Sequence, residues 1–313
     1  MKPDLQKHTD ILNRISPYIH RTPVLTSSTL NEALGAEVLL KSEHLQKMGA
    51  FKMRGATNAA LNLSESQRNK GLVTHSSGNH GQAVALAAKS LGIPAYVVVP
   101  TNAPESKVEA MKGYGAQITM CEPTVEARDR EAQKIAKTTG AHFIHPSNDS
   151  DVIWGQGTAA LELLQDYPDL DIVLVAVGGG GLLAGTCLAA TAFNPNIQVY
   201  AAEPELVSDA KESFEAGKII PSTGAMTVAD GLRTSLGTIN FPIISEHTSD
   251  ILLVSEEEIK DATRWTWERM KQVIEPSAGV PIAALHRYKH LFEGKKIGLI
   301  LCGGNVDLRE LTF

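Results

Sequence analysis

Leu72-Val73-Thr74-His75-Ser76-Ser77-Gly78-Asn79-His80-Gly81 joins a short apolar run to a turn of small residues and then to the start of a helical stretch. The alternation continues downstream, with strands predicted at 72–75, 95–99, 117–121 and 142–144 and helices at 79–91, 104–114 and 125–139. Strands that alternate with helices of this length form right-handed βαβ crossovers, and therefore a parallel sheet. The stretch thus predicts a small lobe built on four parallel strands.

The second half of the chain repeats this pattern around a run of glycines. A strand at 172–177 leads into Gly178, Gly179, Gly180 and Gly181, and then into a helix at 182–193 and a strand at 199–202. Further strands are predicted at 251–254 and 297–301, and helices from a capping box at 255–258 to about 272 and at 277–290. Segment 204–250 is the least regular, and we expect it to border the active site.

The N-terminal segment 1–66 lacks this rhythm. It contains a helix near 4–14, a strand near 37–42 and a helix that begins at Phe51. We expect this segment to join the second half. The sequence therefore predicts an α/β fold with two parallel-sheet lobes, in which a small domain (67–146) is inserted into a discontinuous large domain (1–66 plus 147–313).

Composition limits the class of protein. Among 313 residues, 43% are hydrophobic and 20% are charged, which is ordinary for an enzyme. The net charge of −6 argues against nucleic acid or an anionic membrane as a partner. The apolar runs are too short to cross a bilayer, and the N-terminus lacks a signal-peptide core. The three widely spaced cysteines are typical of reduced thiols, so we expect a cytoplasmic protein.

Lys52 is the strongest candidate for covalent chemistry. Gly49-Ala50-Phe51-Lys52-Met53-Arg54-Gly55 surrounds this amine with small or apolar side chains, a setting in which a lysine loses its proton and bonds to an aldehyde. The turn at 76–81 supplies hydroxyls, an amide, an imidazole and free N–H groups, which suit a carboxylate. A solvated lysine and an ordinary turn before a helix are the alternatives.

The glycines at 178–181 indicate a phosphate site, because they let backbone N–H groups converge on an anion at a helix N-terminus. A dinucleotide-binding enzyme is the rival interpretation. Gly179-Gly180-Gly181-Leu182-Leu183-Ala184 fits the Gly-x-Gly-x-x-Ala pattern, and Glu203 follows where a ribose-binding acid would lie. That interpretation ranks second, because it explains neither Lys52 nor the turn at 76–81.

With these motifs in view, the chain resembles the fold type II pyridoxal-phosphate enzymes of the tryptophan synthase β-like superfamily, and within them the serine racemases and the serine/threonine dehydratases. The resemblance runs from about Ile19 to Leu308. The motifs that carry it are Arg21-Thr22-Pro23-Val24, 49–55, 76–82, Gly155-Gln156-Gly157-Thr158, 178–181, Ala229-Asp230-Gly231, Ile274-Glu275-Pro276-Ser277 and Cys302-Gly303-Gly304-Asn305-Val306-Asp307. Because the sequence given ends at Phe313, we expect no C-terminal regulatory domain.

The resemblance implies pyridoxal 5'-phosphate as cofactor, bonded to Lys52. The residues implied to surround it are Phe51, Lys52, Asn79, Gly178, Gly179, Gly180, Gly181, Gly231, Glu275 and Cys302. Phe51 would pack on the ring, and Asn79 would contact its phenolic oxygen. Cys302 would lie beside the pyridine nitrogen, where similar racemases usually have Ser and some dehydratases have Cys. A thiol cannot hold a pyridinium as a carboxylate can, which favours rapid loss of a β-leaving group.

The implied reaction is L-serine/D-serine interconversion with an L-serine/L-threonine dehydratase (ammonia-lyase) activity beside it. Lys52 would remove the Cα proton on one face and Ser77 would act on the other, although Ser77 could instead bind only the carboxylate. The residues implied to bind the substrate are Ser76, Ser77, Asn79, His80, Arg128 and Thr234. A dehydratase of L-threo-3-hydroxyaspartate or of serine and threonine, without racemase activity, is the alternative.

Two further sites follow from the resemblance. Glu203, Asp209 and the carbonyl of Val207 would bind a divalent cation, and oxygen ligands suit Mg²⁺, Mn²⁺ or Ca²⁺. A helix cap beside a solvated glutamate is the alternative at this site. An ATP effector site at a homodimer interface would use Ser27, Ser28 and Lys47, although Met48 replaces a polar residue there.

Overall fold

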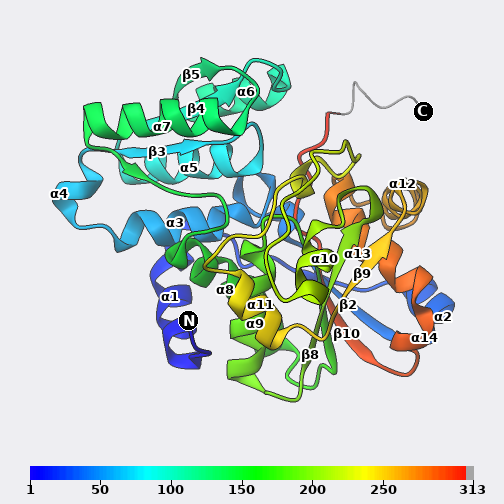
Figure 1. Cartoon of the computed structure of the whole chain (residues 1–313). Coiled ribbons are helices and arrows are strands. Elements are labelled where there is room, and N and C mark those ends of the chain that lie inside the picture. Colours follow the sequence, from blue (N-terminus) through cyan, green and yellow to red (C-terminus); the bar gives the residue numbers. More distant parts are fainter. Residues whose placement is uncertain (308–313) are drawn as a thin grey trace.

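Two separate sheets organise the computed structural model, which describes residues 1–307 (Figure 1). The large sheet has six strands in the order β1-β2-β10-β7-β8-β9, and the small sheet has four in the order β5-β4-β3-β6. Within the described residues, neighbouring strands are parallel except β1 and β2. The mixed α/β fold with two parallel-strand sheets is therefore confirmed. The predicted end of the resemblance, Leu308, lies outside the described residues.

The small sheet is covered by helices on both faces. Its elements are β3 (Leu72–His75), α5 (Asn79–Leu91), β4 (Ala95–Pro100), α6 (Glu105–Gly113), β5 (Gln117–Cys121), α7 (Val125–Thr139) and β6 (His142–Phe143). Val73 and Val98 share an apolar cluster with Ala132 of α7, whereas Leu72 and Val97 belong to the cluster that contains α5. Because alternate strand residues point to opposite faces, this division shows that both faces are buried. The four predicted strands are confirmed.

The large sheet combines strands from both ends of the chain. Its strands are β1 (Val24–Leu25), β2 (Glu37–Lys41), β7 (Ile172–Ala176), β8 (Gln198–Pro204), β9 (Asp250–Val254) and β10 (Lys296–Ile300). β2 pairs in parallel with β10, so residues 37–41 belong to the sheet formed by the second half. The domain boundaries between 66 and 67 and between 146 and 147 stay a prediction.

The sequence predicts about half of the helices that lie outside the small sheet. They are α1 (Leu5–Ile15), α2 (Ser28–Leu34), α3 (Lys52–Asn62), α4 (Glu65–Arg68), α8 (Ser150–Asp166), α9 (Gly181–Phe193), α10 (Asp209–Ala216), α11 (Phe241–His247), α12 (Glu256–Trp265), α13 (Pro276–Arg287) and α14 (Lys289–Phe292). The sequence predicts no helix for α2, α4 or α8, and it predicts an irregular segment at 204–250 although α10 and α11 lie there. α12 ends at Trp265 in a π-helical turn, several residues before the predicted end.

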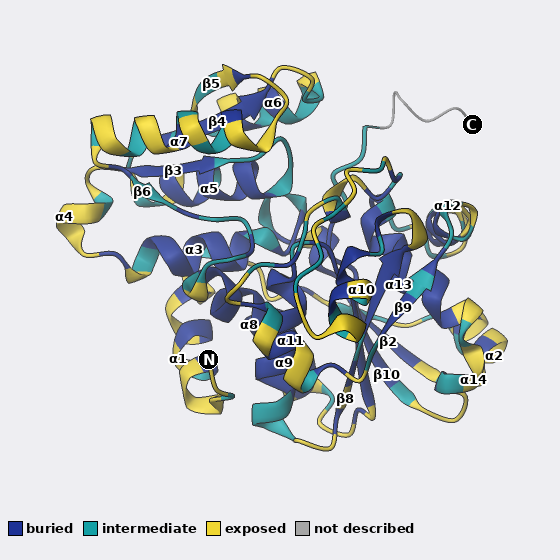
Figure 2. Cartoon of the chain, in the orientation of Figure 1, coloured by how far each residue is buried: buried dark blue, intermediate teal, exposed yellow. Residues whose placement is uncertain are grey.

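Burial follows this arrangement. Figure 2 shows the large sheet and helices α8, α9 and α13 as mostly buried, while exposed residues gather on outer helices such as α4 and α7. None of the helices in residues 1–307 combines the length and the apolar character that crossing a bilayer requires.

Candidate active site

The candidate cofactor cavity lies at the carboxyl ends of β7 and β10. These strands are parallel neighbours, so the glycine turn (residues 178–181) and Cys302 follow them at the same edge of the sheet. The chain before α3 lies against that edge, because the Phe51 N–H donates to the Cys302 carbonyl at 3.0 Å. The resulting cavity has a volume of about 80 Å³. All the predicted cofactor-binding residues line it, so the structure brings them together, while their role stays a prediction.

Lys52 is the first residue of α3 and points its amine into this cavity. Its Nζ donates a hydrogen bond to the carbonyl of Pro146 at 2.7 Å and lies 5.1 Å from the centre of the Phe51 ring. Burial lowers the pKa of Lys52 to about 8, against the opposing effect of Cys302 and Glu275. An appreciable share of this amine is therefore neutral near physiological pH, as a nucleophile or base requires.

The glycine turn can hold an anion. Gly180 has a φ of 80°, and a Cβ atom on Gly179 would lie 2.6 Å from Oγ of Ser147, so these positions require glycine. α9 begins at Gly181, and no side chain caps its N-terminus. Its first N–H groups and its dipole therefore favour a phosphate at this end of the cavity.

Two residues, Asn240 and His145, support the turns around the cavity and were not predicted from the sequence. Asn240 donates through Nδ2 to the carbonyls of Gly179 (2.8 Å) and Ser147 (3.2 Å), and it is fully buried. Nδ1 of His145 accepts the N–H groups of Ser147 (3.1 Å) and Asn148 (2.8 Å), which shapes the turn that presents Pro146 to the lysine. Burial lowers the pKa of His145 to about 4, which keeps the ring neutral and able to accept. No local motif marks these residues, because they act through tertiary contacts.

The other end of the cavity has an acidic group and a thiol. Nδ2 of Asn79 donates to both carboxylate oxygens of Glu275 (2.8 and 3.1 Å), and its Oδ1 accepts from Asn305 (2.9 Å). Burial raises the pKa of Glu275 to about 7. Burial also raises the pKa of the Cys302 thiol well above its usual value, so the thiol stays protonated. A neutral thiol at this position suits a pyridine nitrogen that carries no proton and no positive charge.

The predicted substrate residues are divided between two cavities. Ser77 and Arg128 line a second cavity of about 650 Å³, and Thr234 and Glu275 line both cavities, which are therefore adjacent. Ser76 and His80 line neither. The His80 ring is buried, with Nε2 at 3.2 Å from the carbonyl of Ile144. The structure thus brings Ser77, Arg128 and Thr234 together in the second cavity, whereas the buried His80 side chain lines neither cavity.

The predicted cation site lies where β8 meets α10. The carboxylate of Glu203 accepts the N–H groups of Ala210 (2.8 Å) and Lys211 (2.9 Å), while both carboxylate oxygens of Asp209 are buried without a hydrogen-bond partner among the described residues. Burial raises the pKa of both groups, that of Glu203 to about 8. The residues thus fit a cation, which would relieve an uncompensated buried carboxylate. Residues 1–307 contain no group of three or more Asp, Glu, His or Cys side chains suited to a metal, so backbone oxygens such as that of Val207 would have to contribute.

The predicted nucleotide residues lie outside both cavities. Oγ of Ser27 caps α2 by accepting the N–H of Leu30 at 3.3 Å, and Ser28 is exposed on the first turn of that helix. Lys47 is half-buried in the short helix Lys47–Gly49.

Comparison with known proteins matches residues 15–303 to the family described as pyridoxal-phosphate dependent enzyme. The serine racemase of Dictyostelium discoideum is 48% identical over 303 residues, which are 96% of this chain and 94% of that protein. The beta-hydroxyaspartate dehydratase of Paracoccus denitrificans is 45% identical over 300 residues, covering 96% and 95%. The solved structure of maize serine racemase has a TM-score of 0.96 at 43% identity, covering 99% of this chain and 95% of that one.

Proposed function

Because the chain belongs to the family of pyridoxal-phosphate dependent enzymes, we propose that it interconverts L- and D-serine and also dehydrates L-serine and L-threonine. The observation that carries the proposal is the single cavity that collects an amine of lowered pKa, an anion-binding turn and a neutral thiol. Relatives named as serine racemases support the choice of substrate. Family membership decides against the nicotinamide oxidoreductase that the glycine run alone allowed.

The residues present fit the cofactor. The glycine turn would hold its phosphate, Lys52 would bond to its aldehyde, and Cys302 would lie at the ring nitrogen. When bound, pyridoxal phosphate would supply an aldehyde for the substrate amine and a ring system that acidifies the Cα–H bond.

The chain's own groups then handle the protons. The Lys52 amine takes the Cα proton from one face, and the Ser77 hydroxyl returns a proton to the other, which inverts the configuration. The turn at 76–79 binds the substrate carboxylate through its hydroxyls and the N–H groups at the start of α5. If the β-hydroxyl departs before the proton returns, the product hydrolyses to a keto acid and ammonia. One site therefore serves both reactions.

The test of the proposed function is reductive trapping. We expect the purified enzyme to be yellow, and borohydride to remove the visible band while fixing the cofactor covalently to Lys52, as peptide mass spectrometry would show. Lys52→Arg is the control, because it keeps the charge but cannot form the bond. A colourless protein that binds NADH and ignores added pyridoxal phosphate would refute the proposal.

A dehydratase of 3-hydroxyaspartate is the second candidate, and the Arg128 guanidinium favours it, in a 650 Å³ cavity whose wall has three basic and three acidic side chains. Lys107, Arg128 and Arg233 line this cavity. Lys107 pairs with Asp230, and Arg233 donates to the carbonyl of Thr227. A guanidinium offers several donors, so a second substrate carboxylate could be bound there.

The effect of replacing Arg128 on each substrate distinguishes the racemase from the 3-hydroxyaspartate dehydratase. If 3-hydroxyaspartate is the main substrate, Arg128→Gln should lower its kcat/KM by about 10- to 100-fold and leave that of L-serine nearly unchanged. Arg130→Gln is the matched control, because Arg130 lies on the same helix and pairs with Glu131 on the exposed surface. Steady-state assays of keto-acid formation measure both. Equal losses for the two substrates would remove the support for the dehydratase.

A divalent cation at Glu203, Asp209 and Val207 is also part of the proposal, supported by the unpartnered Asp209 carboxylate. We further propose a homodimer in the cytoplasm, and ATP as an effector at Ser27, Ser28 and Lys47. The cytoplasm agrees with three cysteines that are free and buried. The nucleotide site rests on the resemblance of these positions alone.

A further inference from the structure

The motif Gly155-Gln156-Gly157-Thr158 lies in the middle of α8 and lines neither cavity. α8 nevertheless packs between two of the helices that begin at the candidate active site. On one side is α3, whose first residue is Lys52, and on the other is α9, which begins at the last residue of the glycine turn. The position of α8 therefore determines where the reactive amine lies relative to the anion-binding turn.

Glycines bring these three helices into backbone contact. A Cβ atom on Gly155 would lie 2.7 Å from Cα of Gly55 on α3. A Cβ atom on Gly157 would lie 2.5 Å from the carbonyl oxygen of Gly185 on α9. Both distances are shorter than a real side chain permits, so the helices could not keep this spacing with larger residues.

The two polar residues of the motif contact the first turn of α3. Phe51, at the N-cap of that helix, makes no side-chain capping hydrogen bond. Instead Oε1 of Gln156 accepts the N–H of Gly55 at 3.1 Å, and Oγ of Thr158 accepts from Nη1 of Arg54 at 3.3 Å. All four residues of the motif thus fix α8 to one of its neighbours, and two of them hold the turn that carries Lys52.

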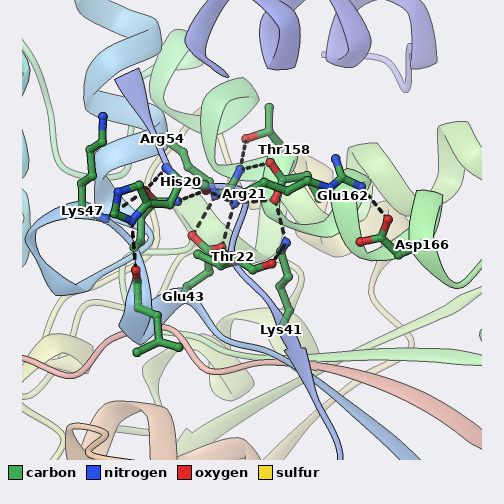
Figure 3. A network of polar contacts seen from close by, with 12 residues as sticks. His20, Arg21, Thr22, Lys41, Glu43, Lys47, Arg54, Thr158, Glu162 and Asp166 are labelled. Carbon is green, nitrogen blue, oxygen red and sulfur yellow. Dashed lines mark hydrogen bonds and ion pairs between the residues drawn. The ribbon is translucent and has the colours of Figure 1, made fainter. Parts of the chain in front are cut away.

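Arg54 is also the centre of a buried quartet of charges, formed with Lys41, Glu43 and Glu162 (Figure 3). Its Nε and Nη2 donate to Glu43 at 2.7 and 2.8 Å, and its Nη1 and Nη2 donate to Glu162 at 3.0 and 2.7 Å. Nζ of Lys41 donates to Glu162 at 2.6 Å. All four side chains are at most 2% exposed, and their formal charges sum to zero. The quartet ties α3 to α8, to the end of β2 and to the turn after it.

Stability does not explain the quartet, because apolar residues of similar volume commonly stabilise a core as well as buried ion pairs do. Bidentate pairs add geometric specificity that apolar contacts lack. Arg54 lies two residues after Lys52, so a fixed guanidinium fixes the rotation and axial register of the first turn of α3. We propose that Arg54 and Glu162 are positioning residues, which aim the Lys52 amine relative to the glycine turn through α8. This inference rests on the proposed function.

The test compares two carboxylates one turn apart on α8. Glu162→Gln keeps the shape of the side chain but breaks the bidentate charge pair. Asp166→Asn is the matched control, because Asp166 pairs with Arg21 at the surface (side chains 39% and 50% exposed). In the holoenzymes, we would measure the fraction of cofactor that a short borohydride treatment fixes to Lys52, kcat and KM for L-serine, and the melting temperature.

For Glu162→Gln we expect the trapped fraction to fall by about tenfold and kcat to fall by about 10- to 100-fold, the size expected when a reacting group is displaced by about 1 Å. KM for L-serine should stay within about twofold, because the carboxylate-binding turn is untouched. Asp166→Asn should match the unchanged enzyme in every respect.

A second variant separates positioning from charge balance. Lys41→Met combined with Glu162→Gln leaves only Arg54 and Glu43, a neutral pair. We expect this double variant to regain melting temperature relative to Glu162→Gln, but not the trapped fraction or kcat. If trapping and kcat recover together with the melting temperature, the quartet is only structural and the inference is wrong. If Glu162→Gln traps cofactor normally, the inference fails while the proposed function stands. If even the unchanged enzyme forms no lysine-bound cofactor, the proposed function itself fails.

Discussion

The pKa of Lys52 illustrates how far the chemistry of a single residue depends on its surroundings. The pKa of Lys52 falls because burial outweighs the nearby Cys302 and Glu275, both of which act in the opposite direction. Burial keeps the Cys302 thiol protonated and raises the pKa of Glu275 to about 7, so that this carboxyl is partly ionised near neutral pH. The cavity therefore collects groups whose pKa values differ from those in water, as is usual where proton transfer occurs.

Ser77→Ala tests the proton donor on the second face. If Ser77 is that donor, the interconversion of L- and D-serine should fall by about 10²–10⁴-fold, the usual contribution of a general acid or base. Pyruvate formation from L-serine should persist, because it needs only Lys52 and a departing hydroxyl. D-serine should become a poor substrate for both reactions. Chiral chromatography and a coupled pyruvate assay measure the two outcomes.

Ser106→Ala is the matched control, because Ser106 lines the same 650 Å³ cavity as Ser77 but has no part in the proposed proton transfer or carboxylate binding. Should Ser77→Ala lose L-serine dehydration as severely as racemisation, Ser77 would be binding the carboxylate only. An unchanged enzyme that never forms D-serine would be a dehydratase.

At the scale of elements, the sequence predicted the strands and helices that alternate regularly, and it did not predict the buried helix α8. The crossovers of the small sheet follow from apolar strands alternating with helices, and each was predicted within about two residues. α8 was not assigned, because two glycines interrupt it and nearly all of 152–164 is buried, which leaves no amphipathic period to detect. Those glycines are necessary for contact with α3 and α9, a tertiary requirement that local propensity does not reveal.

The predicted divalent-cation site lies at the junction of β8 and α10 and can be tested with a chelator. Removing divalent cations with a chelator should lower the melting temperature, because a ligand that binds only the folded state stabilises it by RT ln(1 + [L]/Kd), about 2.7 kcal/mol at a hundredfold excess over Kd. Asp209→Asn and Glu203→Ala should melt alike with and without chelator, as scanning calorimetry would show.

Glu205→Gln is the control for this experiment, since Glu205 lies between the two ligands but pairs with Arg287 at the surface. It should respond to the chelator as the unchanged enzyme does. Identical chelator responses in Asp209→Asn and in the unchanged enzyme would place the cation elsewhere.

At the scale of the whole molecule, the site forms where the carboxyl ends of strands from both sheets meet. The turn after β3 comes from the small sheet, and the turns after β7 and β10 come from the large sheet. The sequence predicted these contributors because each is a contiguous motif with chemistry of its own. It could not predict the Pro146 carbonyl or Asn240, since their roles exist only after the two sheets are assembled.

The pairing of β2 with β10 has a consequence for how the chain is made. On the ribosome, residues 37–41 emerge long before their parallel neighbour at 296–300. All four strands of the small sheet lie within 72–143 and can close long before that. The four-stranded sheet can therefore become structured while the six-stranded sheet still lacks a strand. During this interval the growing chain exposes an apolar segment that chaperones would be expected to bind.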